Sequence, residues 1–472
     1  MPEQVEGGAT SSTDNSQDEK SDTIKAYIFV LFDGTNNNMY NIESYRKLDE
    51  EKYAIVRGVK KFVVRKLLRG SSTEEFSNVA RLSKVCKTDV SSTTWVSYVY
   101  VDGIGTSTSS DSGIVGQGLG VGDLGVEAKV QKGCELIVGC LNDMYDESGK
   151  EECQVSLNIA ATGFSRGAAA ARRFASCANT RKGGESPYNV CLKKHLESSM
   201  KENITLENDT VNISVLGLFD TVSSFGVGKT LKSSNPFLSN KETLKEYANN
   251  VKELSLNELE ADYIFQLCAA DEYRLHFGLT KVPEEDKNYI IPGCHSDVGG
   301  GIIDNKEEKY SMISKLLDYG NISTRRSGNG NKTKEELLNE GWFTSADIEN
   351  GERIVSNKYS FIPFTYMLEK VFKKHLTEVN SKLFDDSAQR SLQYGQDAWK
   401  NDKELSQKEK SVLDTFLGDV MGDKAMYSFP NISKYLGDRK DEMKILRNKF
   451  LHLSSHGHAV HVASPDNERI VI

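Results

Sequence analysis

The sequence has no excess of basic residues and no long apolar run. It contains 59 Lys and Arg against 68 Asp and Glu, which gives a net charge of −9. Proteins that bind duplex nucleic acid use basic faces to displace counterions from the phosphates, so nucleic acid is not an expected partner. No apolar run approaches the roughly 18 residues that a membrane-spanning helix requires.

A signal peptide and paired cysteines are also missing. The first 25 residues lack the charged-then-apolar layout of a secretory leader, so we expect a soluble chain that is made in the cytoplasm. The eight cysteines include no C-x-x-C pair, which argues against a disulfide framework or a zinc ribbon. We expect free, mostly buried thiols.

The composition, with 38% hydrophobic and 27% charged residues, is that of a folded protein. Residues 1–23 are almost entirely small and polar, which predicts a flexible tail. We expect a catalytic core over 24–302, a helical insertion or lid over 303–440, and C-terminal strands over 441–472 that return to the core.

Several strand-like segments end in clusters of polar residues and glycines. They alternate with helical segments, which predicts βαβ units and a mostly parallel sheet with helices on both faces. The expected strands are Ala26 to Phe32, Trp95 to Val101, Val155 to Ile159, Val211 to Phe219 and Tyr289 to Ile291. Functional sites in such sheets form at the C-terminal ends of the strands, and every one of these clusters lies at such an end.

Two further segments are expected to be helical. Asn257 and Glu260 resemble a capping box, and the apolar residues that follow share one helical face up to Gly278. Between Phe361 and Phe372, apolar residues also fall at helical spacing. The second helix is expected to face the core, with contact to lipid acyl chains as the alternative.

The segment Gly163-Phe164-Ser165-Arg166-Gly167 matches the G-x-S-x-G nucleophile elbow. The bare pattern is weak, but here a strand precedes it and an alanine-rich helix follows it, as the elbow requires. Flanking glycines are needed because a β-carbon would clash in so tight a turn. We therefore interpret Ser165 as a nucleophile, and a structural serine is the alternative.

A serine nucleophile needs a base and a carboxylate that orients the base. In α/β-hydrolases these follow the serine in the order acid, then histidine. Asp220 and His295 come directly after later strands and reproduce that order. The competing candidates for the acid are Asp33, Asp102 and Asp297. The remaining histidines fit the base less well: His195 and His375 lie in charged helical contexts, and His276 precedes a helix end.

An oxyanion hole needs two backbone donors, one of which is the residue after the nucleophile, here Arg166. We expect the second donor in another strand-end loop, at Gly34 or Thr35, with a purely structural turn as the alternative.

Two other patterns have simpler explanations. Gly120, Gly122 and Gly125 are spaced as in a dinucleotide fingerprint but follow a glycine-rich loop instead of a strand. Four histidines gather near the C-terminus without a carboxylate or cysteine at ligand spacing, so no metal site is expected. They are His452, His456, His458 and His461.

Five motifs in order resemble the DUF2235 family, which includes the type VI secretion lipase effectors of the Tle1 class. The motifs are Phe32-Asp33-Gly34-Thr35-Asn36, Gly103-Ile104-Gly105-Thr106, Gly163-Phe164-Ser165-Arg166-Gly167-Ala168, Phe219-Asp220-Thr221-Val222 and His295-Ser296-Asp297-Val298-Gly299-Gly300. The resemblance implies the triad Ser165, Asp220 and His295. It also implies phospholipase A activity on bacterial membranes, secretion through a spike or adaptor protein into a target-cell periplasm, and a cognate immunity protein.

The expected protein is thus an α/β-hydrolase-like serine lipase that acts as an antibacterial effector. Its chemistry requires no metal or cofactor, and a need for calcium stays open. One alternative is an esterase or thioesterase that acts on soluble substrates. Another is a secretion-associated binding module without catalysis.

Overall fold

The computed structural model describes residues 23–52, 75–106, 125–179, 191–208, 210–224, 240–274, 277–309, 334–391, 394–422, 435, 437–454, 469 and 471–472. The expected polar tail and most of the glycine-rich stretch around Gly120 therefore lie outside the described residues. Among the described residues, every helix is too short or too polar to cross a bilayer.

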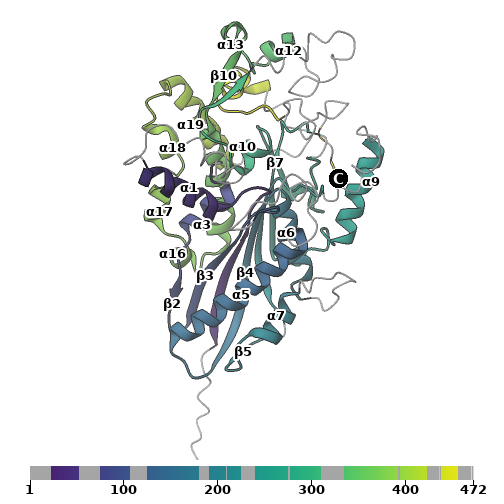
Figure 1. The fold of residues 1–472 in the computed structure, drawn as a ribbon, viewed down its shortest axis with the longest axis vertical. Helices are drawn as coiled ribbons and strands as arrows, with labels where there is room; N and C mark the ends of the chain where they lie inside the picture. Colours follow the sequence, from purple (N-terminus) through teal and green to yellow (C-terminus); the bar gives the residue numbers. More distant parts are fainter. Residues whose placement is uncertain are drawn as a thin grey trace, which may run out of the picture.

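An eight-stranded sheet forms the centre of the molecule (Figure 1). Its order is β2-β3-β1-β4-β6-β7-β8, with β5 paired to β4. All pairs are parallel except β2 with β3. The strands are β1 (Ile24–Phe32), β2 (Asp89–Val90), β3 (Thr94–Val101), β4 (Cys153–Phe164), β5 (Ile204–Leu206), β6 (Asn212–Phe219), β7 (Tyr263–Ala269) and β8 (Asn288–Ile291).

The sheet separates two hydrophobic cores, as the side chains of β1 show. Ile28 and Val30 pack into the core on one face, and Phe29 and Leu31 pack into the core on the other. Successive residues of a strand point to opposite faces, so an apolar strand such as β1 must be covered on both sides. The expected α/β architecture with helices on both faces is confirmed.

On the first face, the helices connect consecutive parallel strands. The longest is α5, whose buried residues recur along one side and pack on α6 and β3. The helices of this layer are α5 (Val126–Ser148), α6 (Arg166–Cys177), α7 (Leu192–Ser199) and α9 (Asn240–Glu253). In α6, a run of alanines permits a close approach of the helix to β4.

The opposite face is covered by early helices and by the helices that the predicted insertion forms between residues 361 and 421. Phe364, Met367 and Phe372 are fully buried there, and the Phe372 ring lies 4.6 Å from that of Phe29. The core-facing interpretation of this segment is confirmed. The elements include α1 (Met39–Lys52), α3 (Asn78–Val85), α14 (Phe361–Tyr366), the π-helical turn η5 (Met367–Phe372), α15 (Lys373–His375), α16 (Asn380–Leu383), α17 (Asp386–Ser391), α18 (Asp397–Lys400) and α19 (Gln407–Met421).

A smaller antiparallel pair extends from this layer at the end of the sheet where the site lies (Figure 1). Short helices accompany this pair. One of them, α21, occupies part of the C-terminal segment after residue 441 in which strands are expected. These elements are β9 (Lys306–Lys309), β10 (Glu352–Val355), α10 (His295–Gly299), α12 (Lys334–Asn339), α13 (Ser345–Asn350), the 3-10 turn η4 (Asn357–Ser360) and α21 (Lys440–Lys449). A second 3-10 turn, η2 (Glu285–Lys287), directly precedes β8.

The helix expected after Asn257 is wrong, because Tyr263–Ala269 is strand β7. Ile264 faces one core, whereas Phe265 and Leu267 face the other. A strand that is buried on both faces shows no polar alternation, so its apolar residues can also be arranged on one side of a helix. Instead of capping a helix, Asn257 accepts a hydrogen bond from Arg172.

Candidate active site

Ser165 lies at the turn between β4 and α6 in a strained backbone conformation. Its φ is 60° and its ψ is −125°, values that a residue with a side chain rarely adopts. A β-carbon on Gly163 would lie 2.3 Å from the carbonyl oxygen of Gly167, and one on Gly167 would lie 2.2 Å from that of Asp33. The glycine pattern therefore has the steric cause that the motif predicts, and the turn has the geometry of a nucleophile elbow.

Asp220 follows directly after β6, next to the elbow. Its carboxylate Oδ1 accepts the backbone N–H of Ala269 at 2.8 Å, and its own N–H donates to the carbonyl of Leu267 at 2.7 Å. Both partners belong to β7. The side chain is therefore fixed on the end of the sheet and fully buried.

His295 begins the short helix α10, which follows β8 across a turn. Its ring nitrogen Nδ1 lies 2.6 Å from Oδ2 of Asp220. The ring packs against Phe164, with centroids 4.5 Å apart, and meets the edge of Phe277 at 5.0 Å. Because Nδ1 is held by the carboxylate, Nε2 is the ring nitrogen left for proton transfer.

The backbone connects this pair to the elbow. The N–H of Ser165 donates to the carbonyl of Phe219 at 3.0 Å, and the carbonyl of Ser165 accepts from Val222 at 3.2 Å. Ser165 thus lies beside Asp220 at neighbouring strand ends, and Phe164, the residue before it, contacts the imidazole. Within the described part of the chain, no hydrogen bond joins Ser165 Oγ to His295; such contacts often tighten only when substrate binds.

A second charged side chain, Arg469, also holds the Asp220 carboxylate. Arg469 donates to Oδ1 and Oδ2, each at 2.6 Å. Burial by itself would raise the pKa of Asp220, but the Arg469 guanidinium and the hydrogen bond from His295 hold this pKa well below its usual value. Burial lowers the pKa of His295 below 6.5, and Asp220 opposes that shift. At neutral pH the geometry therefore combines an ionised carboxylate with a neutral imidazole.

A buried ion pair lies behind the imidazole. Glu272 accepts from Arg274 through both carboxylate oxygens at 2.8 Å and also accepts the N–H of His295 at 3.2 Å. Burial opposes ionisation of Glu272, but Arg274 lowers its pKa. This pair fixes the backbone from which the His295 side chain projects.

The loop after β1 lies against the elbow, as expected for an oxyanion hole. The Arg166 side chain donates from Nη1 to Thr35 Oγ1 at 3.0 Å and from Nε to the carbonyl of Ser224 at 2.9 Å. The N–H of Gly34 already donates to Asp33 Oδ1 at 2.7 Å, so Gly34 is the weaker of the two candidate donors. Among the described residues, no acceptor takes the Thr35 N–H.

The three competing carboxylates have other partners. Asp33 accepts from Ser77 and Tyr100 as well as from Gly34. Asp102 forms an ion pair with Lys129 at 2.8 Å. Asp297 accepts the N–H of Cys294 and holds Nδ1 of His452 at 2.7 Å. Of the four aspartates, only Asp220 lies within hydrogen-bonding distance of His295 in the described structure.

The other predicted features are partly covered by the structure. His195 and His375 are partly exposed on helices α7 and α15, and His375 stacks on Tyr263. Outside the described residues lie His276, His456, His458 and His461, together with Gly120 and Gly122. All eight cysteines are free and seven are buried, as expected. Among the described residues, no three His, Cys, Asp or Glu side chains lie together as metal ligands would.

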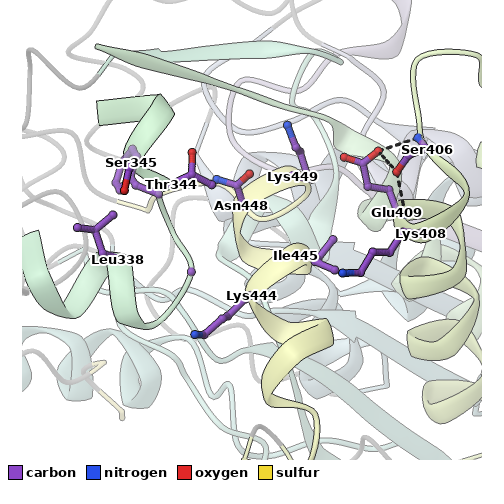
Figure 2. Close-up of a pocket in the computed structure, with 12 residues that line it drawn as sticks. Leu338, Thr344, Ser345, Ser406, Lys408, Glu409, Lys444, Ile445, Asn448 and Lys449 are labelled. Atoms are coloured by element: carbon purple, nitrogen blue, oxygen red, sulfur yellow. Dashed lines mark hydrogen bonds between the residues drawn. The ribbon is translucent and has the colours of Figure 1, made fainter. Parts of the chain in front are cut away.

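A separate pocket of about 510 Å³ lies among the α12–α13 segment, the start of α19 and α21. Its wall combines apolar side chains such as Phe343 and Ile445 with Lys444 and Lys449, and Figure 2 shows the capping contact between Ser406 and Glu409 at its edge. None of the predicted site residues lines this pocket.

Sequence reasoning did not identify Arg469, Glu272 or Arg274. Glu272 and Arg274 follow β7, whose sequence pattern predicts a helix. The pattern therefore does not indicate that these two residues lie at the end of a strand. Arg469 is 249 residues away from Asp220 in the sequence, and no local motif surrounds it. A buried, ionised carboxylate needs a nearby positive charge. That requirement predicts a cationic partner for Asp220 but does not identify which Lys or Arg supplies it.

Comparisons with known proteins identify a family that this chain resembles. A family model described as the catalytic domain of Tle1-like type VI secretion phospholipase effectors matches residues 178–319. The matched range contains Asp220 and His295, and Ser165 lies before it. The resemblance to the Tle1 class that the motifs indicate is thereby confirmed. No protein of curated function matches the sequence.

Two solved structures are similar to the chain. The structure of the Tle1 effector bound to the VgrG spike from the type 6 secretion system has 19% sequence identity and a TM-score of 0.54, covering 96% of this chain and 89% of that chain. At this identity, the likeness shows the fold alone. An uncharacterized protein from Pseudomonas aeruginosa has 14% identity and a TM-score of 0.34, covering 92% of this chain and 65% of that chain.

Proposed function

We propose that this chain, which resembles the Tle1-like effectors in its motifs and in its catalytic-domain match, is a serine-dependent phospholipase A. The observation that carries the proposal is the hydrogen bond between Asp220 and His295 beside a strained Ser165 elbow. The acid, the base and the nucleophile lie at the same end of one parallel sheet and follow the chain order of α/β-hydrolases.

The reaction begins when His295 Nε2 takes the Ser165 hydroxyl proton and Oγ attacks the ester carbonyl of the lipid. The resulting oxyanion accepts hydrogen bonds from the N–H groups of Arg166 and Thr35. Arg166 is the first residue of α6 and directly follows Ser165, which is the position of one oxyanion donor in a nucleophile elbow. When the ester bond breaks, His295 donates the proton to the departing lysophospholipid oxygen.

Water completes the cycle. His295 takes a proton from the water molecule, hydroxide attacks the acyl-serine, and the Ser165 oxygen leaves with the proton that His295 returns. The products are a fatty acid, a lysophospholipid and the free enzyme. Because the reaction requires neutral His295, whose pKa is lowered by burial, activity is expected to fall only at a pH below 6.5.

The biological setting is proposed on the same basis. Since the similar Tle1 effector is bound to a VgrG spike, we place this chain as cargo of a type VI spike or its adaptor. Its target is then the phospholipid of a competing cell, reached from the periplasm, and the producing cell needs an immunity protein. Co-purification with the spike protein tests this part independently of catalysis.

The catalytic proposal is tested by fatty-acid release from vesicles of phosphatidylethanolamine and phosphatidylglycerol. The wild-type protein should release fatty acid and Ser165→Ala should not, whereas Ser198→Ala, which changes an exposed serine on α7, should retain full activity. A soluble short-chain ester is assayed in parallel. Hydrolysis of that ester alone would replace the phospholipase with an esterase, and full activity of Ser165→Ala would refute the serine mechanism.

A further inference from the structure

Arg469 lies in the site although the reaction described above does not use it. Its side chain is 5% exposed. It forms a two-pronged contact with the Asp220 carboxylate and also donates to the carbonyls of Ala269 at 2.8 Å and Phe277 at 3.3 Å. A guanidinium with this many fixed partners has one orientation.

The backbone near Arg469 is attached to the same end of the sheet. Val471 forms a parallel bridge with Leu279, and Leu279 forms an antiparallel bridge with Val222, two residues after Asp220. Ile472 exchanges backbone hydrogen bonds with Leu279 and Lys281 at 2.8 and 3.1 Å. Arg469 is thus held beside Asp220 by main-chain contacts as well as by its own side chain.

The charged groups around Asp220 and His295 show how Arg469 affects the charge balance of this pair. The groups that face Asp220 and His295 are Arg469, Glu272, Arg274 and the thiol of Cys268. Glu272 and Arg274 neutralise each other through a direct ion pair. Among the described residues, a protonated His295 would be the only cationic partner within reach of the Asp220 carboxylate without Arg469.

We propose that Arg469 is a positioning residue that keeps Asp220 ionised and directs its Oδ2 toward His295. This inference rests on the proposed function, because it assigns a role relative to the triad. Arg469 does not contact the reacting atoms. It acts through Asp220 by fixing the plane of the carboxylate and by balancing its charge, which leaves the imidazole free to accept the proton of Ser165.

Replacing Arg469 with Gln tests the charge balance. Without the positive charge of Arg469, the Asp220 carboxylate favours a protonated His295. The acid limb of the pH profile, where kcat/KM falls as the pH decreases, should therefore move to higher pH by on the order of one unit. The profile is measured for fatty-acid release from mixed micelles. The matched control is Arg353→Gln, because Arg353 is also buried and forms an ion pair with a carboxylate, Glu308, at 2.5 Å. It should lower thermal stability without moving the limb.

A conservative variant tests the orientation of the carboxylate. Arg469→Lys keeps the positive charge but loses the planar fork, so its acid limb should match that of the wild type while kcat falls by roughly tenfold. This variant also supplies the test if Arg469→Gln does not fold. A wild-type kcat in Arg469→Lys would overturn the positioning role, and an unmoved limb in folded Arg469→Gln would overturn the charge role.

Ser165→Ala is assayed in the same series to separate the two proposals. If it is inactive and the Arg469 variants behave as the wild type, only the inference about Arg469 fails. If Ser165→Ala is as active as the wild type, the proposed function fails first, and the pH profiles no longer report on His295.

Discussion

Two buried aspartates each follow a phenylalanine at the end of a parallel strand, but their different partners shift their pKa values in opposite directions. Asp33 follows Phe32 of β1, and Asp220 follows Phe219 of β6; both are at most 2% exposed. Asp220 has Arg469 and His295 as partners. The partners of Asp33 are neutral donors, namely a backbone N–H and two hydroxyl groups.

The difference in partners shifts the pKa values of the two carboxyl groups in opposite directions. Burial raises the pKa of Asp33 to about 6, although its hydrogen bonds partly oppose the shift. In Asp220 the charge of Arg469 reverses the effect of burial. The same strand-end position therefore suits two roles. One is the ionised carboxylate that we propose orients the base, and the other is a hydrogen-bonded group that organises the loop next to the elbow.

The largest expected effect separates the two aspartates by activity. Asp220→Asn should lower kcat on phospholipid by about 10⁴-fold, as loss of the orienting carboxylate does in serine hydrolases. Asp33→Asn should stay within roughly tenfold of wild type, because the amide keeps one acceptor and does not contact His295. Steady-state kinetics at pH 7.5 make the comparison. Equal losses in the two variants would show that Asp33 also takes part in the chemistry.

The next effect is a stability difference that depends on pH. The folded-state pKa of Asp33 is raised from 3.8 to about 6, so the unfolded chain loses this proton first, and stability from this group falls as the pH rises through the window from 4 to 6. Asp33→Asn removes that loss. Urea unfolding should show the variant gaining up to about 3 kcal/mol relative to wild type between pH 4 and pH 7.5.

A stability gain in Asp33→Asn that does not depend on pH would contradict the raised pKa of Asp33. Asp220 has the opposite sign: because its folded-state pKa is lowered, it contributes stability above the pKa of the unfolded chain, and that contribution is lost as the pH falls. Asp220→Asn should therefore be more destabilising at pH 7.5 than at pH 3.5 in the same experiment.

A smaller effect is expected where the two loops touch. In Gly167→Ala the new β-carbon would lie 2.2 Å from the carbonyl oxygen of Asp33, which forces the elbow and the β1 loop apart. The free energy of unfolding should fall by about 1–3 kcal/mol, with a loss of activity. The control is Gly139→Ala in α5, where a β-carbon meets nothing within 4 Å and the helix should be stabilised. Equal stability of the two variants would contradict the steric account.

The smallest effect, on stability without an expected loss of activity, concerns one hydrogen bond of Asp33. Tyr100 donates to Asp33 Oδ2 at 2.5 Å and accepts the N–H of Met39 at 3.0 Å. Tyr100→Phe should cost about 1–3 kcal/mol of stability because both partners stay buried, and it should raise the pKa of Asp33 further. Tyr98→Phe on the same strand is the control. If the two variants unfold at the same urea concentration, Tyr100 does not hold the loop.

Local sequence patterns predicted most of the sheet and placed the candidate site residues at the ends of its strands. Each of the five expected strands is present, because each combines a short apolar run with a turn-rich end. The glycines around Ser165 were interpreted correctly for a steric reason that the structure displays. The choice of Asp220 over Asp33 came from chain order, and both follow an apolar strand ending in Phe, so the local sequence alone does not separate them.

The features that the sequence did not predict, namely strand β7 and the charged residues around the candidate triad, depend on tertiary contacts. The segment Tyr263–Ala269 was mistaken for a helix because a strand buried on both faces has no alternation to reveal it. That error also hid Glu272 and Arg274. Arg469 could not be found because its function depends on a partner 249 residues away, and charge compensation between distant segments leaves no spacing in the sequence.

The central claim is that Ser165 is a nucleophile activated by His295 and Asp220. A fluorophosphonate reacts covalently with activated serines, and mass spectrometry of the digested protein locates the adduct. The account predicts stoichiometric labelling of Ser165 in the wild type, with labelling in Asp220→Asn slowed by orders of magnitude although that variant is folded. Label on another serine, or an active enzyme in which Ser165 stays unmodified, would contradict it.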